Sequence, residues 1–320
     1  MKAAPGQVRL FAAPLRDFSA FCLFLALALS LPLQRHASAQ ARQKDADDDV
    51  VRVESDLVIL NVTVTDRRGR YVHKLTRPDF KIFEDGREQQ VGFFSVEETP
   101  FAAAILLDTS GSMETRITLA RAAAIRFLEG LREEDVASVY HFDSVVEQLQ
   151  DFSPGRDLPP LAYSLKSKGM TTLNDAVLRA AKDLSRRPEK RRAIILLTDG
   201  MDTKSGATAE KALNAALAAN ATIYTVDMSD PLTAAAAHAQ GAGALRYFAG
   251  KSGGRYVSTP GGQALDDAFA EILDEMSNQY TLGYRPTNQA HDGRWRSIEL
   301  KLSRDDLNAR TRNGYRAPKS

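Results

Sequence analysis

The pattern of apolar and polar positions changes three times along the chain. An apolar run occupies residues 18–33, and short runs that alternate apolar with polar positions follow between residues 50 and 98. From residue 100 to residue 278, continuous apolar runs alternate with segments of helical period, and simple alternation then returns. Alternating runs are typical of strands with one buried face, and continuous runs between helices are typical of strands buried on both faces.

The central segment, residues 100–278, is predicted to be an α/β domain with a doubly wound, mostly parallel sheet. Strands and helices alternate at the spacing of β-α-β units, which places helices on both faces of the sheet. Strands are expected at 101–107, 136–142, 193–197 and 222–226, and helices at 113–131, 173–184, 209–219 and 264–278. The segment 234–237, followed by Gly241 and Gly243, is expected to be a flexible loop or a weak helix.

The two flanking segments are predicted to be strand-rich and too small to fold alone. Residues 50–98 show no helical period, and strands are expected at 57–65, 80–84, 91–96, 279–285 and 294–302. We therefore predict that residues 50–98 and 279–316 together build a small flanking β-sandwich, with the central domain inserted between its halves. The alternative is two separate pieces, of which the C-terminal one packs only on the central domain.

The first 39 residues are predicted to be a cleavable signal peptide. Three basic residues precede the apolar run, Pro32 ends it, and Ala37-Ser38-Ala39 forms a cleavage site of small residues. The mature chain would begin at Gln40 with a charged linker over residues 40–49. An uncleaved membrane anchor is the alternative, but the run is short for a span. We expect a secreted or periplasmic protein with no stable membrane insertion after cleavage.

Charge and cysteine content narrow the classes of function. The chain of 320 residues has 42 Lys and Arg against 41 Asp and Glu. It therefore lacks the global positive field that holds nucleic acid, and we expect no nucleic-acid partner. The one cysteine, Cys22, lies in the predicted signal peptide. A mature chain without thiols suits an oxidising compartment and excludes both a disulfide framework and a cysteine zinc site.

Polar oxygen side chains follow two of the predicted buried strands. The strand 101–107 is followed by Asp108-Thr109-Ser110-Gly111-Ser112, and the strand 193–197 by Thr198-Asp199-Gly200. Between them, the loop 169–175 carries further hydroxyls into a helix. Because the carboxyl ends of parallel strands form the ligand-binding edge of such a sheet, these side chains are expected to converge. Carboxylates and hydroxyls are hard ligands, which select Mg²⁺, Mn²⁺ or Ca²⁺.

These three segments resemble, in order and position, the metal-ion-dependent adhesion site of the von Willebrand factor type A domain. The resemblance covers about residues 101–278. It implies direct contacts to a divalent cation from Ser110, Ser112 and Thr171, and contacts through water from Asp108 and Asp199. Mg²⁺ is the expected ion, with Mn²⁺ or Ca²⁺ as alternatives. Asp175 is expected to bond helix amides or the site loop rather than the metal.

The flanking segments carry a second resemblance. The block from Leu75 to Gly86, the block Gln279–Tyr284 and the tripeptide Asn313-Gly314-Tyr315 are similar to secreted bacterial proteins described as acidobacterial von Willebrand factor A-related. This resemblance sharpens the expected architecture more than the expected function.

Other chemistry in the sequence is weak. Taken alone, Asp108 and Ser112 would be helix caps and Asp199 part of a turn, so the metal interpretation rests on the three segments together. Gly250-Lys251-Ser252 lacks the earlier glycine of a phosphate loop, and no hydrolase motif is present. His141 ends a strand predicted beside the site. We expect a plain surface histidine there, and the alternative is a contribution to the site.

The sequence therefore predicts a binding protein rather than an enzyme. A cation held by neutral hydroxyls and water-mediated carboxylates stays under-neutralised, so it can accept a carboxylate from a protein partner as its last ligand. One alternative is a structural subunit of an extracytoplasmic assembly with a purely stabilising metal. The other is a hydrolase in which Asp108 and Asp199 activate a metal-bound water. Partner binding that EDTA blocks would favour the binding protein, and activity on phosphate esters would favour the hydrolase.

Overall fold

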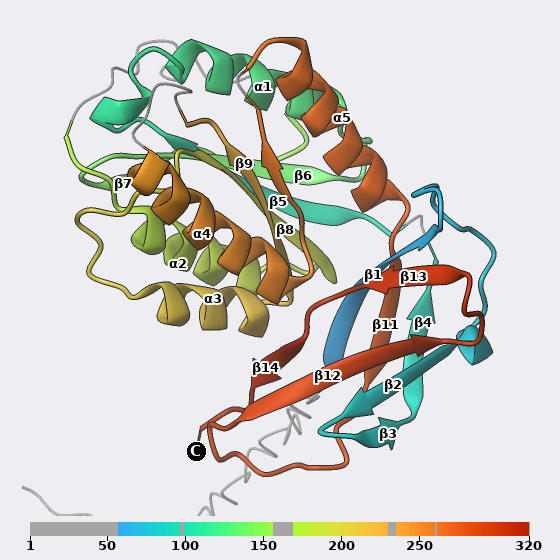
Figure 1. Cartoon of the computed structure of the whole chain (residues 1–320). Coiled ribbons are helices and arrows are strands. Elements are labelled where there is room, and N and C mark those ends of the chain that lie inside the picture. The colour runs from blue at the N-terminus through green and yellow to red at the C-terminus, as the bar shows by residue number, and fades with distance from the viewer. Residues whose placement is uncertain (1–56, 97–98, 156–168, 230–234, 260, 320) are drawn as a thin grey trace, which may run out of the picture. The chain divides into compact units, whose positions relative to one another are not determined.

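A six-stranded sheet forms the core of the central domain. The computed structural model describes residues 57–319 except 97–98, 156–168, 230–234 and 260. The strand order is β10-β9-β8-β5-β6-β7 (Figure 1). These strands are β5 (Phe101–Asp108), β6 (Val136–Phe142), β7 (Val146–Ser153), β8 (Arg191–Thr198), β9 (Ala221–Asp227) and β10 (Tyr256–Ser258). Neighbouring strands are parallel except for β7, which is antiparallel to β6.

Helices cover both faces of this sheet (Figure 1). One face packs against α1 (Ile117–Glu129) and α5 (Gln263–Ser277), and the other against α2 (Leu173–Ser185), α3 (Ala209–Ala218) and α4 (Ala235–Ser252). Successive residues of β5 divide between the two faces. Ala103, Ile105 and Leu107 pack with the first pair of helices, and Ala102, Ala104 and Leu106 pack with the other three. Because side chains alternate across a strand, a strand covered on both faces requires such an uninterrupted apolar run.

Two four-stranded antiparallel sheets form a second domain, which we call the β domain. Their strand orders are β13-β1-β11-β4 and β14-β12-β2-β3. The strands are β1 (Val58–Asp66), β2 (Phe80–Glu84), β3 (Arg87–Gln89), β4 (Val91–Ser95), β11 (Tyr280–Tyr284), β12 (Trp295–Leu302), β13 (Leu307–Arg310) and β14 (Gly314–Arg316). Both sheets contribute to one buried apolar cluster, which includes Leu60, Val62, Ile82 and Leu282. The β domain is therefore a small sandwich with its own core.

Strands from both ends of the chain pair within the β domain. β1 pairs with β11 over Val58–Val62, and β2 pairs with β12 over Phe80–Glu84. β4 also pairs with β11, and β13 also pairs with β1. Each sheet thus combines N-terminal with C-terminal strands, as the apolar pattern predicts. The expected fold class is confirmed: a doubly wound, mostly parallel sheet with a small flanking β-sandwich built from N- and C-terminal strands.

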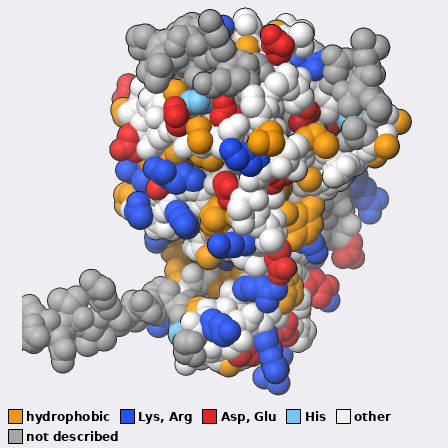
Figure 2. Space-filling view, turned by 90° about the vertical axis from the view of Figure 1, so that its left-hand side faces the viewer, with side chains coloured by type: hydrophobic (Ala, Val, Ile, Leu, Met, Phe, Trp, Pro, Cys, Tyr) orange, Lys and Arg blue, Asp and Glu red, His pale blue; other side chains and the backbone are white. Residues whose placement is uncertain are grey.

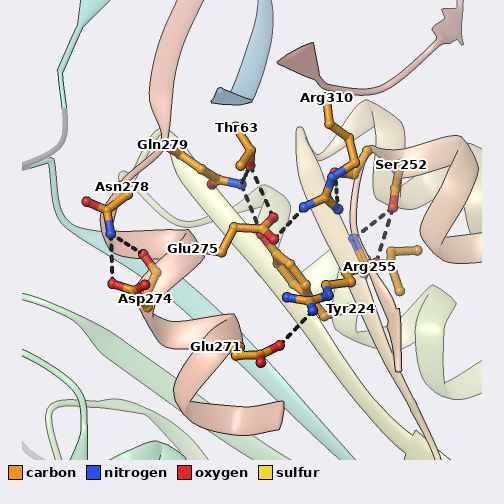
Figure 3. A network of polar contacts seen from close by, with 12 residues as sticks. Thr63, Tyr224, Ser252, Arg255, Glu271, Asp274, Glu275, Asn278, Gln279 and Arg310 are labelled. Carbon is orange, nitrogen blue, oxygen red and sulfur yellow. Dashed lines mark hydrogen bonds and ion pairs between the residues drawn. The ribbon is translucent and has the colours of Figure 1, made fainter. Parts of the chain in front are cut away.

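The two domains meet around Glu275, near the end of α5 (Figure 3). Its carboxylate, only 1% exposed, accepts hydrogen bonds from Thr63 Oγ1 at 3.1 Å and from Tyr224 OH at 2.9 Å. It also forms an ion pair with Arg310 of β13. Gln279 Nε2 donates to Thr63 Oγ1 at 3.2 Å and to Tyr224 OH at 2.9 Å. One buried charge therefore ties strands of the β domain to a helix and a strand of the central domain.

The helix α4 is the largest departure from the predicted elements. It spans 18 residues, where the pattern predicts a loop or a weak helix. The helix buries Leu245 and Phe248 in the core that α2 and α3 share. Gly241 allows it to approach the loop after β8, because a Cβ at this position would lie 2.2 Å from Asp199 O. Packing thus overrides the low helix propensity of the glycines.

The N-terminal predictions lie outside the described residues. These are the signal peptide over residues 1–39, cleavage before Gln40 and the linker over residues 40–49. Across the part of the chain that is described, no helix has both the length and the apolar character needed to cross a membrane.

Candidate metal site

Three loops meet at the carboxyl edge of the central sheet, where the sequence predicts the site. β5 ends at Asp108, and β8 ends at Thr198, whose Oγ1 donates a hydrogen bond to Asp108 Oδ2. The loop that leads into α2 reaches the loop after β5 through Gly111 N, which donates to Gly169 O at 3.4 Å. The structure thereby brings together the segments that carry the predicted ligands Asp108, Ser110, Ser112, Thr171 and Asp199.

Asp108 forms the floor of this site. It is fully buried, and its Oδ1 accepts a hydrogen bond from Ser110 N at 2.8 Å. Burial raises the pKa of Asp108 to about 7, although hydrogen bonds from Ser110 and Thr198 lower it. The negative charge of the neighbouring Asp199 adds to the rise. A buried carboxylate favours its neutral form unless a positive charge lies close by. A divalent cation at this position would supply that charge.

Ser110 and Ser112 place two hydroxyl oxygens side by side. Their Oγ atoms lie 3.2 Å apart, with Ser110 buried and Ser112 exposed. Two oxygens in neighbouring positions of an octahedron are about 2.9 Å apart around Mg²⁺ and about 3.3 Å or more apart around Ca²⁺, from their usual bond lengths. The observed separation lies between these values. The pair therefore fits a hard divalent cation with little movement of the loop.

The loop before α2 is held by its backbone and by Thr172. Thr171 N donates to Thr203 Oγ1 at 2.8 Å, and Thr171 O accepts from the backbone N–H groups of Thr203 and Lys204, each at 3.0 Å. The neighbouring hydroxyl, Thr172 Oγ1, donates to Asp143 O at 2.9 Å. The turn after β6 thus engages the hydroxyl of Thr172, and Thr171 stays the candidate ligand that the resemblance implies.

Asp175 and Asp199 have different surroundings. The carboxylate of Asp175 accepts hydrogen bonds from Gly206 N at 2.8 Å and Ala207 N at 2.9 Å. It fastens the loop after β8 to the start of α2, which is the structural role that the sequence favours for it. Asp199 is half-buried, and its Oδ1 accepts from Met201 N at 3.1 Å. Asp199 therefore lies at the rim of the site, next to solvent.

His141 is not the plain surface histidine that the sequence predicts, and that expectation is wrong. It is buried, because the antiparallel strand β7 covers the edge of β6. Its Nδ1 lies 3.2 Å from Thr109 Oγ1, and its Nε2 lies 3.2 Å from Glu147 Oε2. Thr109 stands between Asp108 and Ser110, so His141 braces the loop that carries them.

Sequence reasoning missed the role of Thr198. Its hydroxyl joins the ends of β5 and β8 through Asp108, and it also accepts a hydrogen bond from Gly200 N at 3.0 Å. The available signal was its place directly before Asp199 at a strand end.

The donor set is dominated by hydroxyl groups. No group of three or more His, Cys, Asp or Glu within the described ranges is placed to hold a metal ion. The candidate site has two carboxylates and three hydroxyls. Such a set suits hard cations and gives soft metals no favoured ligand.

A comparison of the sequence with known families gives a match over the region that contains the candidate site. Residues 103–201 match the model of the von Willebrand factor type A domain, and this stretch contains all five candidate ligands. Residues 103–201 thus match a von Willebrand factor type A domain. The resemblance stated for the central segment is thus confirmed, while similarity to the acidobacterial group stays a prediction.

Individual relatives share limited parts of the chain. The inter-alpha-trypsin inhibitor heavy chain H3 of Homo sapiens is 32% identical over 127 residues, which cover 34% of this chain and 14% of that protein. The solved von Willebrand factor type A structure from Catenulispora acidiphila has 14% identity and a TM-score of 0.45, over 76% of this chain and 74% of that one. The PilB minor pilin from Streptococcus sanguinis has 16% identity and a TM-score of 0.43, over 56% of this chain and 61% of that one.

Proposed function

We propose that this protein is secreted or periplasmic and binds a protein partner through a divalent cation at its von Willebrand factor type A domain. Domains of this family commonly mediate protein–protein interactions. The residues that would hold the ion are Asp108, Ser110, Ser112, Thr171 and Asp199. Mg²⁺ is the ion that we propose first, with Mn²⁺ and Ca²⁺ as alternatives. The partner would supply a carboxylate as a further ligand.

The contrast between a buried floor and an open rim carries this proposal. Asp108 and Ser110 are buried, whereas Ser112 is exposed and Asp199 is half-buried. Residues arranged in this way would hold an ion from the protein side and leave its solvent side to another ligand. Neutral hydroxyls do not cancel the charge of a divalent cation, so the ion would attract an anionic group from a partner.

The surroundings of the site favour binding over catalysis. Binding through a cation requires no general base. Both nitrogens of His141, which contacts the loop after β5, lie within hydrogen-bonding distance of Thr109 and Glu147. This imidazole is therefore engaged in bracing the loop. We propose a non-enzymatic role on this basis.

Selection of peptides tests the proposed partner chemistry. Random peptides displayed on phage would be captured on the immobilised mature chain in Mg²⁺ and eluted with EDTA. We expect the eluted peptides to share an Asp or Glu, and synthetic versions with Asn or Gln in its place to bind at least about tenfold more weakly.

The matched variants for this selection are Ser112→Ala at the site and Ser185→Ala at the end of α2. Ser112→Ala should lose the EDTA-sensitive peptides, and Ser185→Ala should retain them. Peptides that bind equally well in EDTA, or without a carboxylate, would contradict the proposal.

A further inference from the structure

A cavity of about 410 Å³ lies between the central domain and the β domain, away from the candidate metal site. The end of α3 forms one wall, with Leu217 and Ala218. Val58 of β1, Pro286 after β11 and Tyr315 of β14 form walls from the β domain. Figure 1 shows β14 next to α3, and the two elements are in contact. The volume lies in the usual range for small-molecule sites, and most of these walls are apolar.

Arg312 brings a buried positive charge to this cavity. It is 6% exposed, and its Nη1 donates to Leu217 O at 2.6 Å and its Nη2 to Asn220 Oδ1 at 3.1 Å. Both acceptors are uncharged. Its Nε has no hydrogen-bond partner among the described residues. Burial lowers the pKa of Arg312 to about 10, so the side chain is still charged at neutral pH.

Among the described residues, no carboxylate pairs with Arg312, although buried arginines normally have such a partner. Arg310, two residues earlier, shows the normal arrangement through its pair with Glu275. Five N–H groups are available on a guanidinium, and the two hydrogen bonds of Arg312 leave capacity for an anionic acceptor.

A second arginine lies at the rim of the cavity. Arg316 lines it and forms an ion pair with Glu210 of α3, which is not a lining residue. Within the described residues, the lining contains Arg312 and Arg316 and no Asp or Glu. Figure 2 shows the face on the side of α3 and the C-terminus, where Lys and Arg side chains gather with apolar side chains between them. Such a surface favours the approach of an anion with an apolar body.

We propose that this cavity binds a small amphipathic carboxylate, with its apolar chain on the walls and its carboxylate toward Arg312 and Arg316. The apolar walls account for the hydrophobic part of the ligand, and the unmatched positive charge accounts for its anionic group. The site does not depend on the metal proposal. Because the walls come from both domains, a bound ligand would also stabilise their association by mass action.

Octanoate is a suitable probe for the full mature chain, in EDTA so that metal binding plays no part. Isothermal titration should show octanoate binding at least about tenfold more tightly than octanamide, which has the same chain and no charge. Acetate, which has the charge and lacks the chain, should bind more weakly than octanoate.

Three variants locate the site. Arg312→Met should lose octanoate binding, and Arg186→Met, at an exposed arginine after α2, should retain it. Because Arg312 also bonds the end of α3, its replacement could impair folding. Ala218→Trp keeps Arg312 and fills the cavity from an exposed position, and it should weaken octanoate binding at least about tenfold without changing the circular dichroism spectrum.

Three results would overturn the proposal. The first is equal binding of octanoate and octanamide, which would show that charge plays no part. The second is unchanged octanoate binding in a folded Ala218→Trp variant. The third is binding that is seen only after removal of residues 40–56, which would show that the chain's own N-terminal segment fills the cavity.

Discussion

Asp108 and Glu275 are two buried carboxylates with opposite surroundings. Glu275, where the two domains meet, has the guanidinium of Arg310 beside it and two hydroxyl donors. Asp108, at the edge of the central sheet, has a hydroxyl and a backbone N–H, with another carboxylate nearby. A buried negative charge needs a positive partner. The chain supplies one at Glu275, and we propose that an ion supplies one at Asp108.

We propose that this difference separates a structural charge from a functional one. The partners of Glu275 come from both domains, and they close around it on the inside of the protein (Figure 3). The residues around Asp108 open toward solvent at Ser112 and Asp199.

Removal of residues 280–320 tests the structural side of this comparison with the largest expected effect. The truncation removes Arg310 and the strands that pair with β1, β2 and β4. We expect residues 58–95 to lose their hydrogen-exchange protection, while the central domain still binds Mg²⁺. Protection that persists over residues 58–95 would show that this segment folds without its C-terminal partners.

Arg310→Met tests the pair itself. The substitution leaves Glu275 buried without its cation, which usually costs about 3–5 kcal/mol for a fully buried pair. Because the Arg310 side chain is 36% exposed, solvent screens part of this charge, and we expect about 2–3 kcal/mol in the free energy of unfolding in urea.

Two controls accompany this substitution. Adding Glu275→Gln to Arg310→Met should restore much of the lost stability, because it removes the stranded charge. Arg304→Met, which breaks an exposed pair with Asp306, should change stability little. A loss for Arg304→Met as large as that for Arg310→Met would refute the special role of the buried pair.

The apolar pattern predicted the core strands and the sandwich but not the edges of the sheets. β5 and β8 are continuous apolar runs because both faces are covered. β7 mixes Glu, Gln and Asp with apolar residues because it lies at an edge, and β10 has only three residues. Short polar strands of this kind carry little local signal, since their neighbours in the sheet define them.

The candidate ligands could be proposed from the sequence because each follows a strand or precedes a helix in a known order. The contacts of Glu275 could not, because Thr63 lies 212 residues away in the sequence. An acidic residue on an amphipathic helix is ordinarily on its solvent face. The burial of His141 could not be predicted either. It depends on β7, and the sequence of this polar edge strand carries little local signal.

The substitution Asp108→Asn tests the Asp108 side of the comparison, and the experiment uses metal-free protein. The folded-state pKa of Asp108, about 7, lies above its ordinary value of 3.8. The stability that its neutral form contributes is therefore present below about pH 4 and is lost as pH rises through 7. In EDTA, the wild type should lose about 1–3 kcal/mol relative to Asp108→Asn between pH 5 and pH 8, measured by urea unfolding. Parallel profiles of stability against pH for the two proteins would show that burial does not raise the pKa of Asp108.

Asp175→Ala gives the smallest expected effect. The carboxylate of Asp175 accepts hydrogen bonds from two backbone N–H groups. Unlike Glu275, it is not paired with a cationic side chain among the described residues. Loss of these hydrogen bonds should cost about 1–2 kcal/mol in the free energy of unfolding. Asp151→Ala, at an exposed position of β7, is the control and should cost less. A larger loss for Asp175→Ala than for Arg310→Met would reverse the order that the comparison predicts.

The central claim is that Asp108 and the paired hydroxyls hold a divalent cation. Calorimetric titration of Mg²⁺ at pH 8 into the mature chain and three variants tests it directly. The wild type and Asp305→Ala, a control at an exposed position after β12, should bind a single ion with equal affinity. Ser112→Ala should bind at least about tenfold more weakly, and Asp108→Asn should show no binding. Equal binding by all four proteins, or no binding by the wild type, would contradict the account.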